Sequence, residues 1–154
     1  MKKEVASERS ETLERGTKLR MKALLKNVPR ALECVSKWAE EAGFGERALY
    51  EIQLAVDEAC ANVVDHAYQE VDAGDIEVSC QLDGQVLTVR VRDWGQGFDL
   101  GCVAEPDLKA PLEERCLGGL GLFLVKEMMD HVEFVSDPER GNELVMRKRL
   151  EIAG

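Results

Sequence analysis

The spacing of apolar side chains divides most of the chain into predicted strands and helices. Apolar residues that alternate with polar ones indicate strands, and apolar residues three or four positions apart indicate amphipathic helices. Proline, glycine and Asp-Gly pairs then mark where these segments begin, turn and end. The predicted strands are 17–23, 75–82, 86–92, 132–136 and 143–150, and the predicted helices are 29–42, 46–68 and 118–130.

The order of these segments predicts an α+β fold. Short connections between strands, such as the turn at Asp83-Gly84, favour antiparallel hairpins. The helices stand apart from these hairpins instead of alternating regularly with single strands. We therefore expect a mixed, largely antiparallel sheet with helices packed on one face.

The length of 154 residues suits one domain. Residues 1–15 are charged and lack the apolar segment of a signal peptide, so we predict a flexible N-terminal arm there. Residues 98–117 contain prolines and charges without a regular period, which indicates a long loop. Such loops inside compact domains are usually functional lids. We predict a single domain over 16–152 with a lid near 98–117.

The net charge of -10 excludes some classes of partner. Nucleic acids and anionic membranes attract basic surfaces, so we expect neither as a direct partner. Plain solubility and binding to a basic protein both fit the acidic balance. No apolar run approaches the ~20 residues that span a bilayer.

The five cysteines are odd in number and include no C-x-x-C pair, so they indicate neither a disulfide framework nor a zinc site. Cys34, Cys60 and Cys80 fall on apolar faces and are predicted to fill the core. Cys102 and Cys116 lie in the predicted loop. A reducing, cytoplasmic location is the simplest interpretation.

Glu58 and Asn62 are the first candidates for chemistry. They lie four residues apart on the second predicted helix, on the side opposite its apolar stripe. A carboxylate can accept a proton, and an amide oxygen can coordinate magnesium together with phosphates. A solvated helix face has the same pattern, so the pair alone leaves both interpretations open.

A second candidate is Asp93-Trp94-Gly95-Gln96-Gly97, directly after a predicted strand. Its two glycines allow a sharp turn and a close approach to a ligand. A buried Asp93 could accept a hydrogen bond from an amine such as that of adenine. A plain strand-to-loop turn is the alternative interpretation, and Trp94 could pack under the lid or contact a partner.

A third candidate is Gly118-Gly119-Leu120-Gly121-Leu122 at the start of a predicted helix. Free N–H groups and the positive end of the helix dipole favour anions at such a position. A flexible joint between loop and helix is the alternative interpretation.

In this order, the three candidates resemble the nucleotide site shared by gyrase-type topoisomerases, heat-shock-90 chaperones, histidine kinases and mismatch-repair ATPases. Glu-Ala-Cys-Ala-Asn-Val-Val-Asp-His-Ala-Tyr at 58–68 resembles the N box of the anti-sigma-factor serine/threonine kinases within that superfamily. Residues 118–130 resemble the second glycine box and helix of the same branch. The resemblance covers about 17–150 and implies a Bergerat-type sandwich that binds ATP and Mg²⁺.

The resemblance also implies a role for each matching residue. Glu58 would be the base that activates the acceptor hydroxyl, and Asn62 would hold magnesium against the phosphates. Asp93 would bind the adenine amine, with room provided by glycines. The remaining cofactor-binding positions implied are Gly95, Gly97, Gly118, Gly119, Leu120, Gly121 and Asn142. Gly141-Asn142 stands where many relatives have a Gly-Thr pair.

Three functional hypotheses follow. By resemblance, the chain is an ATP-dependent kinase that phosphorylates a small STAS-type antagonist protein and regulates a sigma factor by sequestration. The second hypothesis is a non-catalytic ATP-binding module that acts by sequestration alone. The third is a detached domain of a histidine kinase. The family also implies a homodimer.

Overall fold

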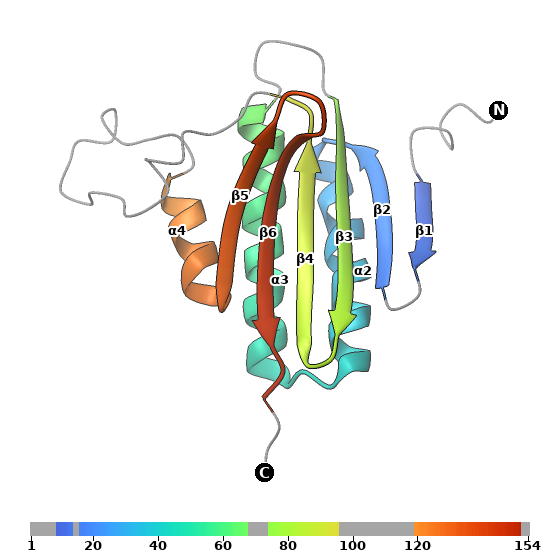
Figure 1. Cartoon of the computed structure of the whole chain (residues 1–154), viewed down its shortest axis with the longest axis vertical. Helices are drawn as coiled ribbons and strands as arrows, with labels where there is room; N and C mark the ends of the chain where they lie inside the picture. Colours follow the sequence, from blue (N-terminus) through green and yellow to red (C-terminus); the bar gives the residue numbers. More distant parts are fainter. Residues whose placement is uncertain (1–8, 14–15, 68–73, 96–118, 152–154) are drawn as a thin grey trace.

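The computed structural model of the chain describes residues 9–13, 16–67, 74–95 and 119–151. Their strands form a six-stranded sheet in the order β1-β2-β3-β4-β6-β5 (Figure 1). Every pairing between these described strands is antiparallel. The strands are β1 (Arg9–Leu13), β2 (Gly16–Lys22), β3 (Asp75–Asp83), β4 (Val86–Asp93), β5 (His131–Asp137) and β6 (Gly141–Arg149).

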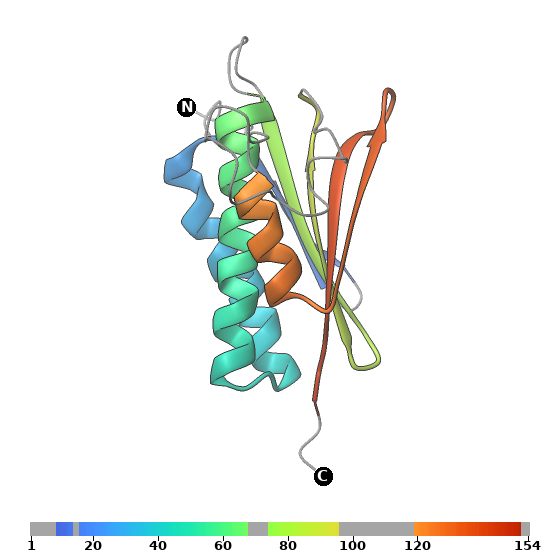
Figure 2. The same ribbon diagram turned by 90° about the vertical axis from the view of Figure 1, so that its left-hand side faces the viewer.

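The helices of the described chain all cover the same face of this sheet, which makes a two-layer sandwich (Figure 2). They are α2 (Val28–Ala42), α3 (Glu46–Asn62) and α4 (Gly119–Met128), with a short turn of 3₁₀ helix, η1 (Leu25–Asn27), before α2. Pro29 lies in the first turn of α2, and Gly43 ends the helix with a left-handed φ of 103°. The predicted α+β fold is confirmed.

The core lies between the two layers and is built as the apolar pattern predicts. Alternate residues of the central strands face the helices, and Ile52, Val56 and Ala59 of α3 meet them at 0–2% exposure. Cys60 and Cys80 belong to this core as small buried side chains. In the described segments no helix is both long and apolar enough to cross a membrane.

Two segments differ from the expectation. Residues 9–13 fall within the predicted arm, yet they form β1 and pair with β2. The helix predicted over 46–68 ends as an α-helix at Asn62 and continues as a π-helical turn, η2 (Val63–Ala67). Such π segments are frequent at functional sites. The other parts of the arm and the predicted lid lie outside the described residues.

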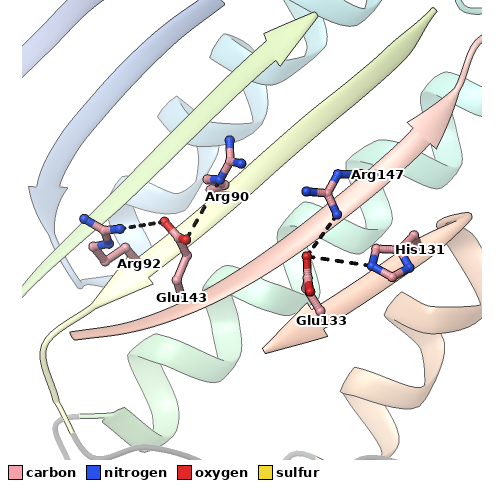
Figure 3. A network of polar contacts seen from close by, with 6 residues as sticks. All are labelled: Arg90, Arg92, His131, Glu133, Glu143 and Arg147. Atoms are coloured by element: carbon pink, nitrogen blue, oxygen red, sulfur yellow. Dashed lines mark hydrogen bonds and ion pairs between the residues drawn. The ribbon is translucent and has the colours of Figure 1, made fainter. Parts of the chain in front are cut away.

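The face of the sheet that carries no helices bears a network of charged side chains (Figure 3). Arg92 on β4 donates to Glu143 on β6 at 2.9 Å, and Arg147 on β6 donates to Glu133 on β5 at 3.0 Å. Arg92 and Glu143 lie directly opposite each other across the strands. The side chains of the Arg92–Glu143 pair are only 31% and 20% exposed, and opposite charges in facing positions favour this register of the strands.

Lys148 on β6 is a charged residue on the inward face. Its Nζ donates to Glu51 Oε1 on α3 at 2.9 Å and to the Met128 carbonyl at the end of α4. Its side chain is 11% exposed and that of Glu51 is 23% exposed. Sequence reasoning placed Glu51 on the polar side of α3, and the structure shows that this side is partly covered. Lys148 therefore ties both helices to the sheet.

Replacing Lys148 tests this tie. In Lys148→Ala, Glu51 and the last carbonyl of α4 lose a charged donor in a poorly solvated position, which should cost about 2–3 kcal/mol of unfolding free energy. Arg147→Ala is the matched control, because Arg147 is adjacent but pairs on the exposed face, so it should cost less than about 1 kcal/mol. Urea unfolding measures both, and equal costs would contradict the proposed tie.

Candidate functional site

The candidate side chains meet at one end of the sandwich. Helix α3 ends, β4 ends and β6 begins at this end, the upper end in Figure 1. Asn62 is the last residue of α3, Asp93 is the last of β4, and Asn142 is the second of β6. All three are polar residues buried to 7% exposure or less. Asp93 and Asn142 face each other in the β4–β6 ladder.

Asp93 is a buried carboxylate with its hydrogen bonds on one oxygen. The Gly95 N–H donates to Oδ1 at 2.9 Å and Asn142 Nδ2 donates to the same atom at 3.0 Å. Burial raises the pKa of Asp93 above its ordinary value, and these two donors oppose the rise because they favour the charged form. The described residues give Oδ2 no hydrogen bond, so this oxygen can accept one from a ligand.

Gly95 brings the end of β4 against the end of η2. A Cβ at this position would collide with the Ala67 carbonyl oxygen and would lie 2.6 Å from its carbonyl carbon. Only glycine permits this approach of two backbones. The glycine predicted to give a ligand room therefore gives room to the turn that follows Asn62.

Asn62 carries a buried polar atom without a partner. The Nδ2 atom is inaccessible to solvent, and no hydrogen-bond partner is found for it in the described part of the chain. Buried polar groups nearly always have a partner, so an orphaned one requires an explanation. The nitrogen and oxygen of an amide side chain are assigned from their hydrogen bonds. The atom of Asn62 without a partner could therefore equally be its oxygen. The site therefore fits a ligand or metal ion at Asn62.

The family model of the histidine kinase-like ATPase domain matches residues 21–148 of the chain. This chain belongs to that family. The match covers Asn62, Asp93 and Asn142 together. The predicted superfamily is thus confirmed.

Curated relatives are similar over most of their length. The serine-protein kinase RsbW of Halalkalibacterium halodurans is 39% identical over 121 residues, which are 76% of this chain and 72% of that protein. The serine-protein kinase RsbW of Listeria monocytogenes is 37% identical over 116 residues, which are 73% of each chain.

Two solved structures share the fold. The RsbU and RsbW domains of a Mycobacterium tuberculosis protein align with a TM-score of 0.61 and 19% identity, over 86% of this chain and 32% of that one. The histidine kinase domain of a blue-light-activated kinase of Erythrobacter litoralis aligns with a TM-score of 0.54 and 16% identity, over 84% of this chain and 62% of that one.

In this histidine kinase-like ATPase domain, Glu58 lies one helical turn before Asn62 on α3. Its side chain is half-buried, whereas that of the adjacent Asp57 is exposed. Asn62 is buried instead of solvated, so the interpretation of this helix side as an ordinary polar surface is wrong at Asn62. Glu58 remains partly accessible to solvent.

The glycine-rich segment is only partly described in this ATPase domain. Gly119, Leu120 and Gly121 are the first residues of α4, where backbone N–H groups lack helical acceptors. That position suits an anion, as the sequence predicts. Gly97 and Gly118 lie outside the described residues.

Among the described residues, no group of three or more histidine, cysteine or carboxylate side chains could hold a metal ion. A magnesium ion near Asn62 could share its oxygen ligands with a bound phosphate. This is the usual situation for magnesium, which rarely has a complete protein cage.

Sequence reasoning missed Ser136 on β5. Its hydroxyl donates to Asn142 Oδ1 at 2.7 Å, so it stands directly behind the partner of Asp93. A serine near a hairpin turn gives no signal of its own. Ser136 and Asn142 face each other in the β5–β6 register, so knowledge of this register would have identified Ser136.

Trp94 received no firm role from the sequence. Its side chain is 37% exposed, and the Arg20 guanidinium carbon lies 4.2 Å from the centre of its ring. The ring also packs against Gly141, where φ is 88° and a Cβ would lie 2.8 Å from Trp94 Cδ1. Trp94 thus contacts the helix-free side of the sheet behind Asp93.

The pH dependence of an Asn142→Ala variant tests the geometry around Asp93. Asn142 donates to the charged form of Asp93, so its contribution is present while Asp93 is ionised. That contribution is lost as the pH falls through the pKa of Asp93, which burial has raised. Asn142→Ala should cost about 1–3 kcal/mol at neutral pH and progressively less under acid conditions.

The control for this measurement is Asn27→Ala. The Asn27 amide donates to the Lys22 carbonyl at 3.0 Å in an exposed position, so its loss should not depend on the ionisation of Asp93. Urea unfolding of both variants over a range of pH gives the comparison. A cost of Asn142→Ala that stays constant down to acid pH would contradict the assigned hydrogen bond to a carboxylate.

Proposed function

We propose that the chain is a serine/threonine kinase that transfers the γ-phosphoryl group of ATP to a hydroxyl of a small regulatory protein. The observation that carries the proposal is the buried Asp93, whose two donors leave one oxygen available at the same end as the orphaned Asn62 amide. Similarity to proteins named serine-protein kinase supports the reaction type.

The nucleotide would bind through groups already at this end. Asp93 Oδ2 accepts a hydrogen bond from the exocyclic amine of adenine. The Asn62 amide oxygen would be a ligand of magnesium, and the bound ion would neutralise charge on the phosphates. Backbone N–H groups at the start of α4 donate to phosphate oxygens.

Glu58 would act on the acceptor. Its carboxylate would accept the proton of the serine or threonine hydroxyl as the hydroxyl oxygen attacks the γ-phosphorus, while the bond from that phosphorus to the bridging β-phosphate oxygen breaks and ADP leaves. Phosphoryl transfer needs little covalent chemistry from the protein, so positioning and charge neutralisation supply most of the acceleration. The half-buried position of Glu58 suits a base that must meet a protein substrate.

The partners follow from the family resemblance. The acceptor would be a STAS-domain antagonist, and the regulated protein would be a sigma factor that the chain sequesters in the cytoplasm. Phosphorylation adds a charge of about -2 to the acceptor, which is sufficient to break an interface. The chain would work as a homodimer.

Phosphate transfer from labelled ATP with magnesium tests the proposal directly. The acceptors are a panel of STAS-domain proteins from the same organism. Label on one of them would support the kinase and identify its partner. ATP binding without label on any acceptor would favour the non-catalytic module that acts by sequestration alone.

Glu58→Ala tests the base. The variant should still bind ATP, because Glu58 is not placed on the nucleotide, and should transfer phosphate about 10²–10⁴ times more slowly. Asp57→Ala is the matched control, since Asp57 is exposed on the same turn of α3 and should transfer at the normal rate. Normal transfer by Glu58→Ala would remove Glu58 from the mechanism.

Asp93→Asn tests the adenine contact. An amide at this position offers a donor where the adenine amine needs an acceptor, so ATP affinity should fall about 10- to 100-fold. Isothermal titration calorimetry measures the affinity, and circular dichroism checks that the fold is kept. Unchanged affinity in a folded variant would show that Asp93 does not bind the base.

A further inference from the structure

Three side chains form one row across neighbouring strands at the candidate site. Ser136 on β5 faces Asn142 on β6, and Asn142 faces Asp93 on β4. The hydroxyl of Ser136 donates to Asn142 Oδ1 at 2.7 Å, and Asn142 Nδ2 donates to Asp93 Oδ1 at 3.0 Å. The row is thus a continuous hydrogen-bond chain that ends on a carboxylate.

The direction of this chain is fixed by its members. Both hydrogens of the Asn142 amide are used, because Nδ2 also donates to the Gly95 carbonyl at 2.9 Å. The amide oxygen can only accept, so Ser136 must be the donor to it. Turning the amide over would place its oxygen against the carboxylate of Asp93 and the carbonyl of Gly95.

The side chain of Asn142 therefore makes its hydrogen bonds to other groups of the protein. It is 5% exposed, and each polar atom of its side chain already has a partner within the protein. The sequence predicts Asn142 as a cofactor-binding residue. With these bonds in place, it acts on a nucleotide through Asp93 instead of through a contact of its own.

We infer that Ser136 is a positioning residue for base recognition: it anchors the Asn142 amide, which occupies one oxygen of Asp93 and leaves the other as a pure acceptor. This inference rests on the proposed function, because it assigns Asp93 to the purine base. Its consequence is selectivity. Adenine presents an amine at its six position and guanine presents a carbonyl, so a carboxylate held in its charged form favours adenine.

Loss of the Ser136 hydroxyl has a different effect if the residue positions Asn142 than if it only packs against it. Ser136→Ala removes the donor to Asn142 Oδ1, so the amide is held less firmly and Asp93 Oδ1 loses part of its support. The carboxylate is then freer to rotate or to take up a proton, and a protonated carboxyl can donate to the guanine carbonyl. ATP affinity should fall while GTP affinity changes less.

Calorimetric titration of ATP and of GTP, with magnesium, on the full chain and its variants provides the test. Ser136→Ala should reduce the ATP-to-GTP affinity ratio about three- to tenfold, the effect expected for one hydrogen bond. Ser136→Thr keeps the hydroxyl and should restore the ratio. Ser79→Ala, on the helix-free face of β3, is the matched control and should leave the ratio unchanged.

The outcomes separate the inference from the proposed function. An unchanged ratio in Ser136→Ala, or an equal loss of both nucleotides, would overturn the positioning role while the kinase proposal stands. A Ser136→Thr variant that behaves like Ser136→Ala would also overturn it. Failure of the unaltered chain to bind ATP would overturn the proposed function itself, and the inference with it.

Discussion

The charge of Asp93, buried at the end of a central strand, is the constraint on which the candidate site depends. Moving a carboxylate out of water is costly unless donors replace the lost hydration. The chain supplies these donors from the Gly95 backbone and the Asn142 side chain, both of which need their own precise placement. Gly95 must approach Ala67, and Gly141 must turn with a φ of 88° so that Asn142 enters β6 opposite Asp93. These two positions, one a close approach and one a left-handed turn, both require glycine and serve one buried charge.

The register of the strands in the sheet determines which side chains lie together at the candidate site. Arg92 precedes Asp93 and Glu143 follows Asn142, so their ion pair lies on the helix-free face directly behind the buried pair (Figure 3). A slip of one residue between β4 and β6 would turn every side chain to the opposite face of the sheet. Arg92 would then enter the core and Asp93 would leave it. This partly buried ion pair opposes the same slip that would destroy the site.

The sequence predicts the elements well because their physics is local. Alternation in 86–92 and the helical period in 46–62 each reflect contact with one core, and each motif of the family resemblance is a short run of neighbouring residues. The sequence could not reveal Ser136 or the partners of Lys148, because these depend on which strands are neighbours and in what register. It also left open whether the side of α3 that carries Asn62 is a solvated polar surface. The burial of Asn62 comes from tertiary structure, and no period within the helix records it.

Helix α3 links the two ends of the domain. Near its start, Glu51 is held by Lys148, which also binds the last carbonyl of α4. At its end, η2 is pressed against Gly95, so Asn62 and Asp93 are fixed relative to each other by backbone packing. A rigid helix fixed at both ends can hold Glu58 and Asn62 at a constant distance from the Asp93 carboxylate. Phosphoryl transfer depends on such positioning, and small displacements of reacting groups reduce its rate steeply. The buried Lys148 therefore helps to hold the helix that carries the site residues, although it lies at the opposite end of that helix.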